Sequence, residues 1–115
     1  MRKKQVKRYN DGVVHIFREK PRRSNFNAKQ NVAVLEDMEF IVKLAYQELS
    51  KREQDFEFAE QNDFSLSLKI KTRFVNGVDN KCKAVIDGWL YDVKYADKTK
   101  TEIYLHLEEV RKIDS

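Results

Sequence analysis

The sequence predicts a mainly β fold: a small antiparallel β-barrel or curled sheet of about six strands with one short helix. Three observations support this prediction. Residues 64–74 alternate apolar and polar side chains, which is the two-residue period of a half-buried strand. Residues 83–95 have the pattern of a hairpin around Asp87-Gly88. The strand–helix–strand spacing of a parallel sheet is missing, so the strand order should be mostly antiparallel.

The length of the chain fits one domain. It has 115 residues and a mass of 13.7 kDa, and 37% of its residues are charged. A domain of this size buries roughly two-thirds of its unfolded surface, which is enough to fold without disulfides or metals. We therefore expect a basic and flexible N-terminal tail at residues 1–10, followed by a single domain at residues 11–115.

Composition argues against a membrane span, a signal peptide and an internal disulfide. The mean hydropathy is −0.74, and the chain contains no run of about 18 apolar residues. The N-terminal stretch MRKKQVKRYN is basic but lacks the apolar core of a signal peptide. Cys82 is the single cysteine, which fits a reducing, cytosolic origin.

Positive and negative charges are segregated along the chain. Residues 1–23 carry nine Lys or Arg against two acids, a net +7, within a chain of net charge +4. Residues 36–63 carry nine acids against three bases, a net −6. This segregation favours a nucleic-acid contact or the docking of one subunit's basic end on a neighbour's acidic segment. A tail that only improves solubility is an equally good explanation.

The first half of the domain should contain two strands separated by a loop. Residues 13–17 follow the turn pair Asp11-Gly12 and predict a first strand. Residues 20–30 are polar and include Pro21, which predicts a loop. Residues 39–49 alternate in period two and are rich in β-branched side chains, so a strand is favoured over a helix there.

A short helix should follow this second strand. Ser50 and Glu53 have the spacing of a capping box, in which each side chain accepts a hydrogen bond from the other residue's backbone N–H. The helix should run for about three turns and stop near Asn62. Phe56 and Phe58 lie about 200° apart on a helix, so they do not share one stripe. One of them is a candidate for contacts outside the core, unless both pack under an adjacent loop.

Residues 64–74 should be the central strand of the fold. Its apolar face carries Phe64, Leu66, Leu68, Ile70, Thr72 and Phe74. Its other face carries Lys69, Lys71 and Arg73, and a slip of one residue would bury these cations, so the register should be strongly specified.

The last third of the chain should be a hairpin and a closing strand. Asn76-Gly77 suits a turn after the central strand. Asp87-Gly88 is a favoured type I′ pair between the two strands of residues 83–95. A second turn at residues 97–100 precedes a final strand, in which Ile103, Leu105 and Leu107 alternate with polar residues.

The sequence lacks a catalytic or metal-binding constellation, so we expect no enzyme activity, no cofactor and no metal. His15 and His106 lie on predicted strands, outside any cluster of His, Cys, Asp and Glu at ligand spacing. Cys82 has no second cysteine beside it and should be a buried or idle thiol. The three glycines each lie in a turn and form no phosphate-binding loop.

The cationic strand face leaves two binding hypotheses open. Lys69, Lys71 and Arg73 are spaced two residues apart and could follow a phosphate backbone, so a small β-barrel that binds single-stranded nucleic acid without sequence specificity is one of them. The same face has no aromatic side chain on which a base could stack. A solvated face or a subunit interface is therefore the more common use of such cations.

The order of these elements resembles that of bacteriophage head–tail adaptors, and in particular the head-closure, or head–tail joining, proteins of long-tailed phages that infect Gram-positive bacteria. Four stretches carry the resemblance: GVVHIF, FIVKLAYQELSKREQDFEFAEQ, FSLSLKIKTRF and AVIDGWLYDVKYADKTKTEIYLHLEEV. The closest local matches are Thr72-Arg73-Phe74 and Tyr91-Asp92-Val93. The resemblance covers residues 11–112, and the extended basic N-terminus departs from it.

The resemblance implies a structural protein of the virion, made in the bacterial host cytoplasm or encoded by a prophage. In that family twelve subunits form a ring beneath the portal protein, although the isolated subunit can be a monomer. The ring extends the DNA exit channel, helps to retain the packaged DNA and provides the docking surface for the tail-completion protein. Double-stranded DNA would touch it without sequence specificity, and no membrane would be involved.

The resemblance also implies which residues face a neighbour or the channel. The segment at residues 49–63 should be an inter-subunit or channel-side element, and the basic tail should reach a neighbour or the portal. The candidate assembly or channel-facing residues are Lys69, Lys71, Arg73, Arg52, Glu53, Phe56, Phe58, Arg22 and Arg23. Different surfaces of each subunit meet in a ring, which agrees with the segregated charge.

Overall fold

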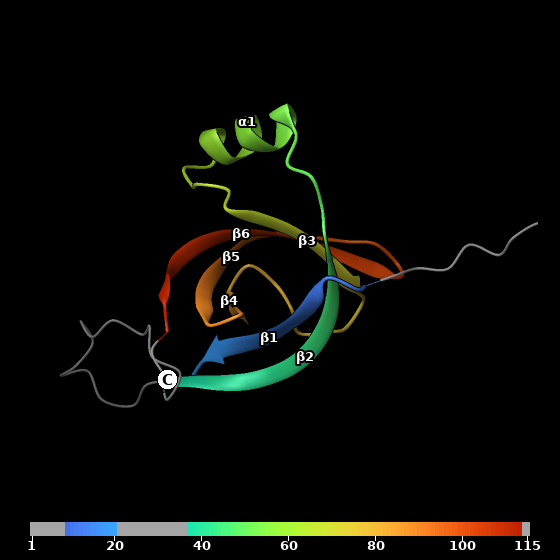
Figure 1. The fold of residues 1–115 in the computed structure, drawn as a ribbon, viewed down its shortest axis with the longest axis vertical. Helices are drawn as coiled ribbons and strands as arrows, with labels where there is room; N and C mark the ends of the chain where they lie inside the picture. Colours follow the sequence, from blue (N-terminus) through green and yellow to red (C-terminus); the bar gives the residue numbers. More distant parts are fainter. Residues whose placement is uncertain (1–8, 21–36, 114–115) are drawn as a thin grey trace, which may run out of the picture.

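A computed structural model describes residues 9–20 and 37–113 of the chain. These residues form a six-stranded barrel with one helix outside it (Figure 1). The elements are β1 (Gly12–Glu19), β2 (Met38–Glu48), α1 (Glu53–Gln61), β3 (Leu68–Arg73), β4 (Cys82–Ile86), β5 (Trp89–Lys98) and β6 (Glu102–Lys112). The predicted mainly β fold of about six strands and one short helix is confirmed.

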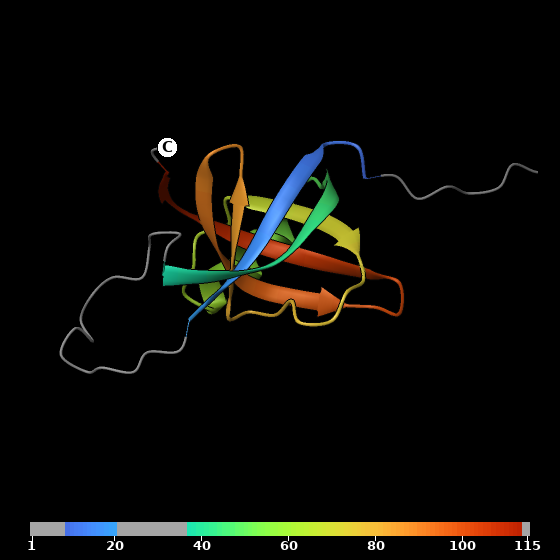
Figure 2. The same ribbon diagram turned by 90° about the horizontal axis from the view of Figure 1, so that it is seen from below.

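The sheet closes on itself. Neighbouring strands follow the order β1-β2-β3-β6-β5-β4, and β4 pairs with β1 to complete the barrel. Every pairing is antiparallel, as the lack of strand–helix–strand spacing predicted. Figure 2 shows the strands crossing one another steeply, as strands must when a small number of them closes a barrel.

Alternate residues of every strand point into the barrel and form the core. On β6 the inward residues are Ile103, Leu105 and Leu107, all fully buried, as the alternation in the last third of the chain predicted. Ile70 of β3 pairs with Leu105, and Thr72 pairs with Ile103, so the inward face predicted for the central strand also lies in the core.

The central strand is shorter than the alternation predicted. β3 begins at Leu68 rather than at Phe64, and residues 64–67 are not strand. Asp63 has a positive φ of 60°, and the Phe64 N–H then returns to the Ala59 carbonyl of the helix at 3.0 Å. Phe64 and Leu66 consequently pack against Ala59 in a small cluster of their own. The apolar residues that alternate over residues 64–74 therefore belong to two clusters, one beneath the helix and one inside the barrel.

β2 confirms the strand predicted at residues 39–49 and adds a bulge. Ile16 of β1 pairs with Val42, whereas the next residue, Phe17, pairs with Phe40. Ile41 is the extra residue of the longer strand, and a bulge of this kind increases local twist. Phe40 is 52% exposed beside Phe17 on the outer surface.

The helix starts two residues later than the predicted capping box. Arg52 is the N-cap, with extended backbone angles, and the Asp55 carboxylate accepts a hydrogen bond from its N–H at 2.8 Å. Asp55 thus takes the role that the sequence pattern assigned to Glu53, and Ser50 lies outside the helix. The predicted stop at Asn62 is confirmed, because this residue is the C-cap.

The hairpin around Asp87-Gly88 is confirmed. Asp87 has a φ of 50° and Gly88 a φ of 81°, which are the two positive values that a type I′ turn requires. β4 and β5 pair on either side of them. The turn predicted at residues 97–100 starts later, because β5 continues to Lys98. The loop predicted at residues 20–30 lies outside the described residues except for Lys20. The basic tail predicted at residues 1–10 also lies outside them except for Tyr9 and Asn10.

Candidate functional site

The outer faces of three neighbouring strands form a platform beneath α1. Cross-strand pairing places Lys69 opposite His106 and Lys71 opposite Tyr104. The same residues of β6 pair with β5, His106 with Tyr95 and Tyr104 with Asp97. Six side chains from β3, β6 and β5 therefore lie in two adjacent rows. Figure 1 shows α1 outside the barrel above β3 and β6, and thus over this platform.

Two of the three cations predicted on the outer face of the central strand, Lys69 and Lys71, are ion-paired within the chain. Lys69 Nζ lies 3.0 Å from the Asp55 carboxylate of α1, and both side chains are largely buried. Lys71 Nζ lies 3.5 Å from the Glu102 carboxylate of β6. Arg73 at the end of β3 is exposed. Lys69 and Lys71 are thus neutralised by carboxylates of the same chain, and the strand face that they share is not a row of unpaired positive charges.

Asp55 connects the start of the helix to the barrel. Its carboxylate accepts hydrogen bonds from the Arg52 N–H at 2.8 Å and from Lys69 Nζ at 3.0 Å. Burial alone would raise the pKa of Asp55, but these two donors outweigh it and lower the pKa below its ordinary value. The carboxylate therefore stays charged where it is needed to hold α1 in place.

An aromatic cluster is the second link between α1 and the barrel. Phe58 lies 4.8 Å from the ring of Tyr95 and 6.0 Å from that of His106, measured between centroids. Tyr95 and His106 meet edge to face at 5.3 Å. Phe56 points away from this cluster and is 48% exposed. The prediction that Phe56 and Phe58 cannot share one stripe is confirmed, and Phe56 is the exposed member.

A pocket of about 310 Å³ opens where the helix meets the platform. Rings and carboxylates dominate its lining, which consists of Asp55, Phe58, Lys69, Tyr95, Asp97, Tyr104 and His106. His106 is only 7% exposed, and its Nδ1 has no hydrogen-bond partner among the described residues. A buried polar atom without a partner is uncommon in a folded protein and marks this pocket as a candidate site.

The surroundings of His106 favour its neutral form. Burial is the main cause that lowers the pKa of His106, and the Lys69 ammonium acts in the same direction. The carboxylates of Asp55 and Asp97 oppose these effects without cancelling them. An imidazole that stays neutral near pH 7 retains one nitrogen as a hydrogen-bond acceptor.

We expect His106 to make the protein less stable in mild acid. The unfolded chain takes up the proton near pH 6.5, before the folded one does, so stability should fall as the pH drops from about 7 to 5. The loss is at most about 1.4 kcal/mol per pH unit for one proton. His106→Phe should reduce this loss, whereas His15→Phe should retain it. Urea unfolding at several pH values measures the effect, and equal slopes in the native protein and His106→Phe would contradict it.

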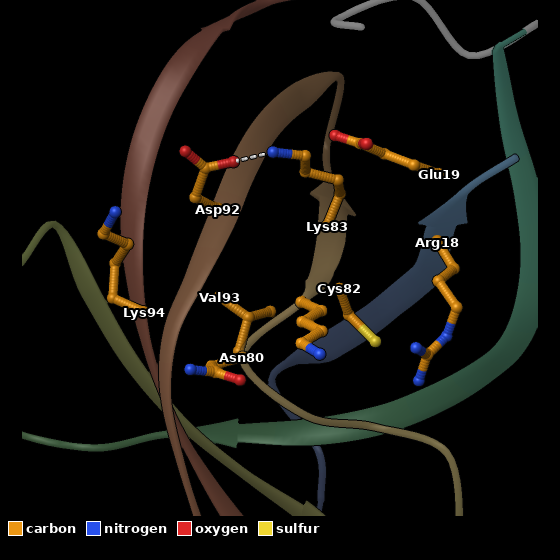
Figure 3. A pocket seen from close by; sticks show the side chains of 9 residues that line it. Arg18, Glu19, Asn80, Cys82, Lys83, Asp92, Val93 and Lys94 are labelled. Atoms are coloured by element: carbon orange, nitrogen blue, oxygen red, sulfur yellow. Dashed lines mark hydrogen bonds and ion pairs between the residues drawn. The ribbon is translucent and has the colours of Figure 1, made fainter. Parts of the chain in front are cut away.

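A second pocket, of about 450 Å³, lies where β1, β4 and β5 meet. Figure 3 shows Lys83 pointing toward Asp92, and their charged atoms are 2.6 Å apart. Arg18 lines the pocket from β1 and pairs with Asp79 at 3.3 Å. The buried Cys82 thiol donates to the Gly77 carbonyl at 3.4 Å, and burial raises the pKa of the thiol. The charges of this pocket are largely satisfied within the chain, and its thiol is held in the unreactive form.

A third surface, an aromatic one, lies on the opposite strands of the barrel. His15, Phe17 and Phe40 share the outer face of β1 and β2, with Phe17 and Phe40 5.6 Å apart, edge to face, and His15 6.2 Å from Phe40. Lys43 pairs with His15 and is exposed. Sequence reasoning missed this surface, although the alternation in GVVHIF already placed His15 and Phe17 on the face opposite the core.

The other predicted assembly residues are only partly brought together. Arg52 and Glu53 are exposed at the start of α1, close to the Asp55–Lys69 ion pair. Arg22 and Arg23 lie outside the described residues. Within residues 9–20 and 37–113, no group of three or more His, Cys, Asp or Glu is placed to hold a metal ion. None of the helices in that part of the chain is long and apolar enough to span a membrane.

The chain matches no protein-family model, and no curated protein matches it.

Proposed function

We propose that this protein is a connector of a tailed bacteriophage, which assembles as a ring beneath the portal, closes the DNA-filled head and offers a docking surface for the tail. The order of elements carries the proposal. A strand, a second strand leading into a short helix, a third strand, a hairpin and a closing strand follow one another, as in the head-closure proteins that the sequence resembles. These elements build one closed barrel.

The exposed side of α1 supports an assembly role. The helix contains Glu53, Asp55, Glu57 and Glu60 and no basic residue. Of these acids only Asp55 is buried, so three carboxylates face outward with the exposed Phe56. An acidic helix with one exposed aromatic ring suits contact with a basic surface of a neighbouring subunit. Such a contact joins two different surfaces, as ring closure requires.

Electron microscopy of the protein mixed with a portal protein from the same genome tests the proposal. We expect rings stacked on the portal, and Phe56→Ala should reduce the occupied fraction because an exposed aromatic anchor is lost from the interface. Phe40→Ala is the matched control, since Phe40 is exposed to a similar extent on the opposite side of the barrel. Free portals at every protein concentration would refute the connector role.

The aromatic surface of β1 and β2 favours a second candidate, the binding of single-stranded nucleic acid. Bases stack on exposed aromatic rings while nearby lysines contact phosphates, and Phe17, Phe40 and Lys43 provide such groups. Lys69 and Lys71, on which this hypothesis first rested, are occupied by Asp55 and Glu102. The stacking platform would thus be β1–β2 and not β3.

Under this second candidate, Phe40→Ala should weaken binding about 5- to 150-fold, because one stacked base is worth roughly 1–3 kcal/mol. Phe56→Ala should leave the affinity unchanged. Fluorescence anisotropy with a labelled oligonucleotide at several salt concentrations measures both. Absence of binding at low salt, or equal effects of the two substitutions, would rule the candidate out.

A further inference from the structure

The pocket beneath α1 has the composition of a site for an organic cation. Phe58, Tyr95 and Tyr104 line it with aromatic rings, whose faces attract ammonium and guanidinium groups. Asp97 lines it with a carboxylate and is exposed. Lys69 is the one cation of the lining, and its charge is taken up by Asp55 at 3.0 Å.

His106 adds a buried imidazole ring to the same lining. Its side chain is more than nine-tenths buried, and Nδ1 meets no partner among the described residues. Its ring is held between Phe58 and Tyr95, so it cannot turn toward solvent without disturbing both contacts. A lysine or arginine side chain in the pocket would place its positive charge against these rings and near the Asp97 carboxylate.

The described chain begins close to this pocket. The Tyr9 hydroxyl donates to one oxygen of the Glu102 carboxylate at 2.8 Å, and the Tyr104 hydroxyl donates to the other at 3.4 Å. Tyr104 is itself part of the pocket lining. From Glu102 to His106 the strand advances only about 13 Å, whereas eight extended residues reach about 26 Å. The eight residues that precede Tyr9 are therefore long enough to reach every part of the pocket.

Those eight residues have the matching chemistry. The sequence MRKKQVKR contains Arg2, Lys3, Lys4, Lys7 and Arg8 and no acid. We propose that the pocket between α1 and the β5–β6 face binds a lysine or arginine side chain of residues 1–8 of the same chain. Attachment at Tyr9 gives these cations a high effective concentration at the pocket, which a free basic peptide would lack.

Zero-length carbodiimide cross-linking of the full-length protein tests this binding. A mixture of equal amounts of unlabelled and ¹⁵N-labelled protein distinguishes links within one chain from links between chains. We expect mass spectrometry to find Lys3, Lys4 or Lys7 joined to Asp97 within one isotopic species. Links of these lysines only to other carboxylates, or only between differently labelled chains, would overturn the proposal.

Charge reversal provides a second readout. Lys3→Glu with Lys4→Glu should shift the NMR resonances of the His106 and Tyr95 rings, because the cation that lies against them is lost. Lys98→Glu with Lys100→Glu is the matched control: it reverses the same charge at the exposed end of β5 and should leave these resonances in place. Unchanged His106 resonances in the tail variant, or equal shifts in both variants, would overturn the proposal. Neither readout depends on ring formation.

Discussion

Leu105→Ala should lower the free energy of unfolding by about 2–5 kcal/mol. Leu105 is fully buried at the middle of β6, where it pairs with Ile70 on one side and Ala96 on the other. Truncation to alanine removes contacts in the centre of a closed barrel, whose strands cannot move together to fill the space without breaking the pairing around the ring. The melting temperature should fall by at least about 10 °C.

Val110→Ala is the control for this substitution. Val110 lies on the same strand but is 41% exposed, so its truncation should change stability by about 0.5 kcal/mol or less. Urea unfolding followed by circular dichroism measures both variants. Similar midpoints for Leu105→Ala and Val110→Ala would mean that the interior of the barrel is not the source of its stability.

Asp55→Ala should release α1 from the barrel while leaving the barrel folded. The substitution removes the group that accepts the Arg52 N–H and leaves Lys69 buried without its carboxylate, a combined cost of about 2–3 kcal/mol. Amide hydrogen exchange in residues 53–61 should accelerate about 30- to 150-fold, because the helix opens locally. Exchange in β6 should be almost unchanged, since its core residues do not depend on α1.

Two further variants sharpen the interpretation of Asp55→Ala. Glu57→Ala removes an exposed carboxylate from the same helix and should have little effect on exchange. Asp55→Asn combined with Lys69→Met should restore part of the protection, because no unpaired charge is then left beneath the helix. Exchange rates for Asp55→Ala that match those for Glu57→Ala would show that the ion pair does not hold α1 in place.

Most of the strands and the helix could be predicted from the sequence because their formation depends on local signals. The period of two predicted β2 and the inward faces of β3 and β6, and Asp87-Gly88 predicted the hairpin. The stop at Asn62 was also predicted, whereas the capping box was placed at Ser50 although Asp55 has the decisive contact. Serine is a preferred N-cap residue and arginine is not, so local sequence favoured Ser50 over Arg52 as the start of the helix.

The candidate site was harder to predict because it depends on contacts between distant residues. From the sequence alone, Lys69 has no visible ion-pair partner. In the structure α1 lies over β3 and places the Asp55 carboxylate beside it. The alternation of β6 places His106 on the outer face of the strand, where side chains are usually exposed. It is buried because Phe58 and Tyr95 cover it. The pattern of a strand states which face a side chain occupies but does not state what lies above that face.

The pairing of β1 with β4 also determines how this chain must fold. His15 of β1 meets Val85 of β4, so about 70 residues must be folded back before the barrel can close. Because the entropy of forming such a large loop is lost before its contacts are gained, proteins dominated by distant pairings fold in milliseconds to seconds rather than in microseconds. Until β1 and β4 pair, each exposes an unpaired strand edge, and an incompletely folded chain is prone to pair with another copy. The nascent chain is therefore most vulnerable to aggregation between the synthesis of β1 and the synthesis of β4.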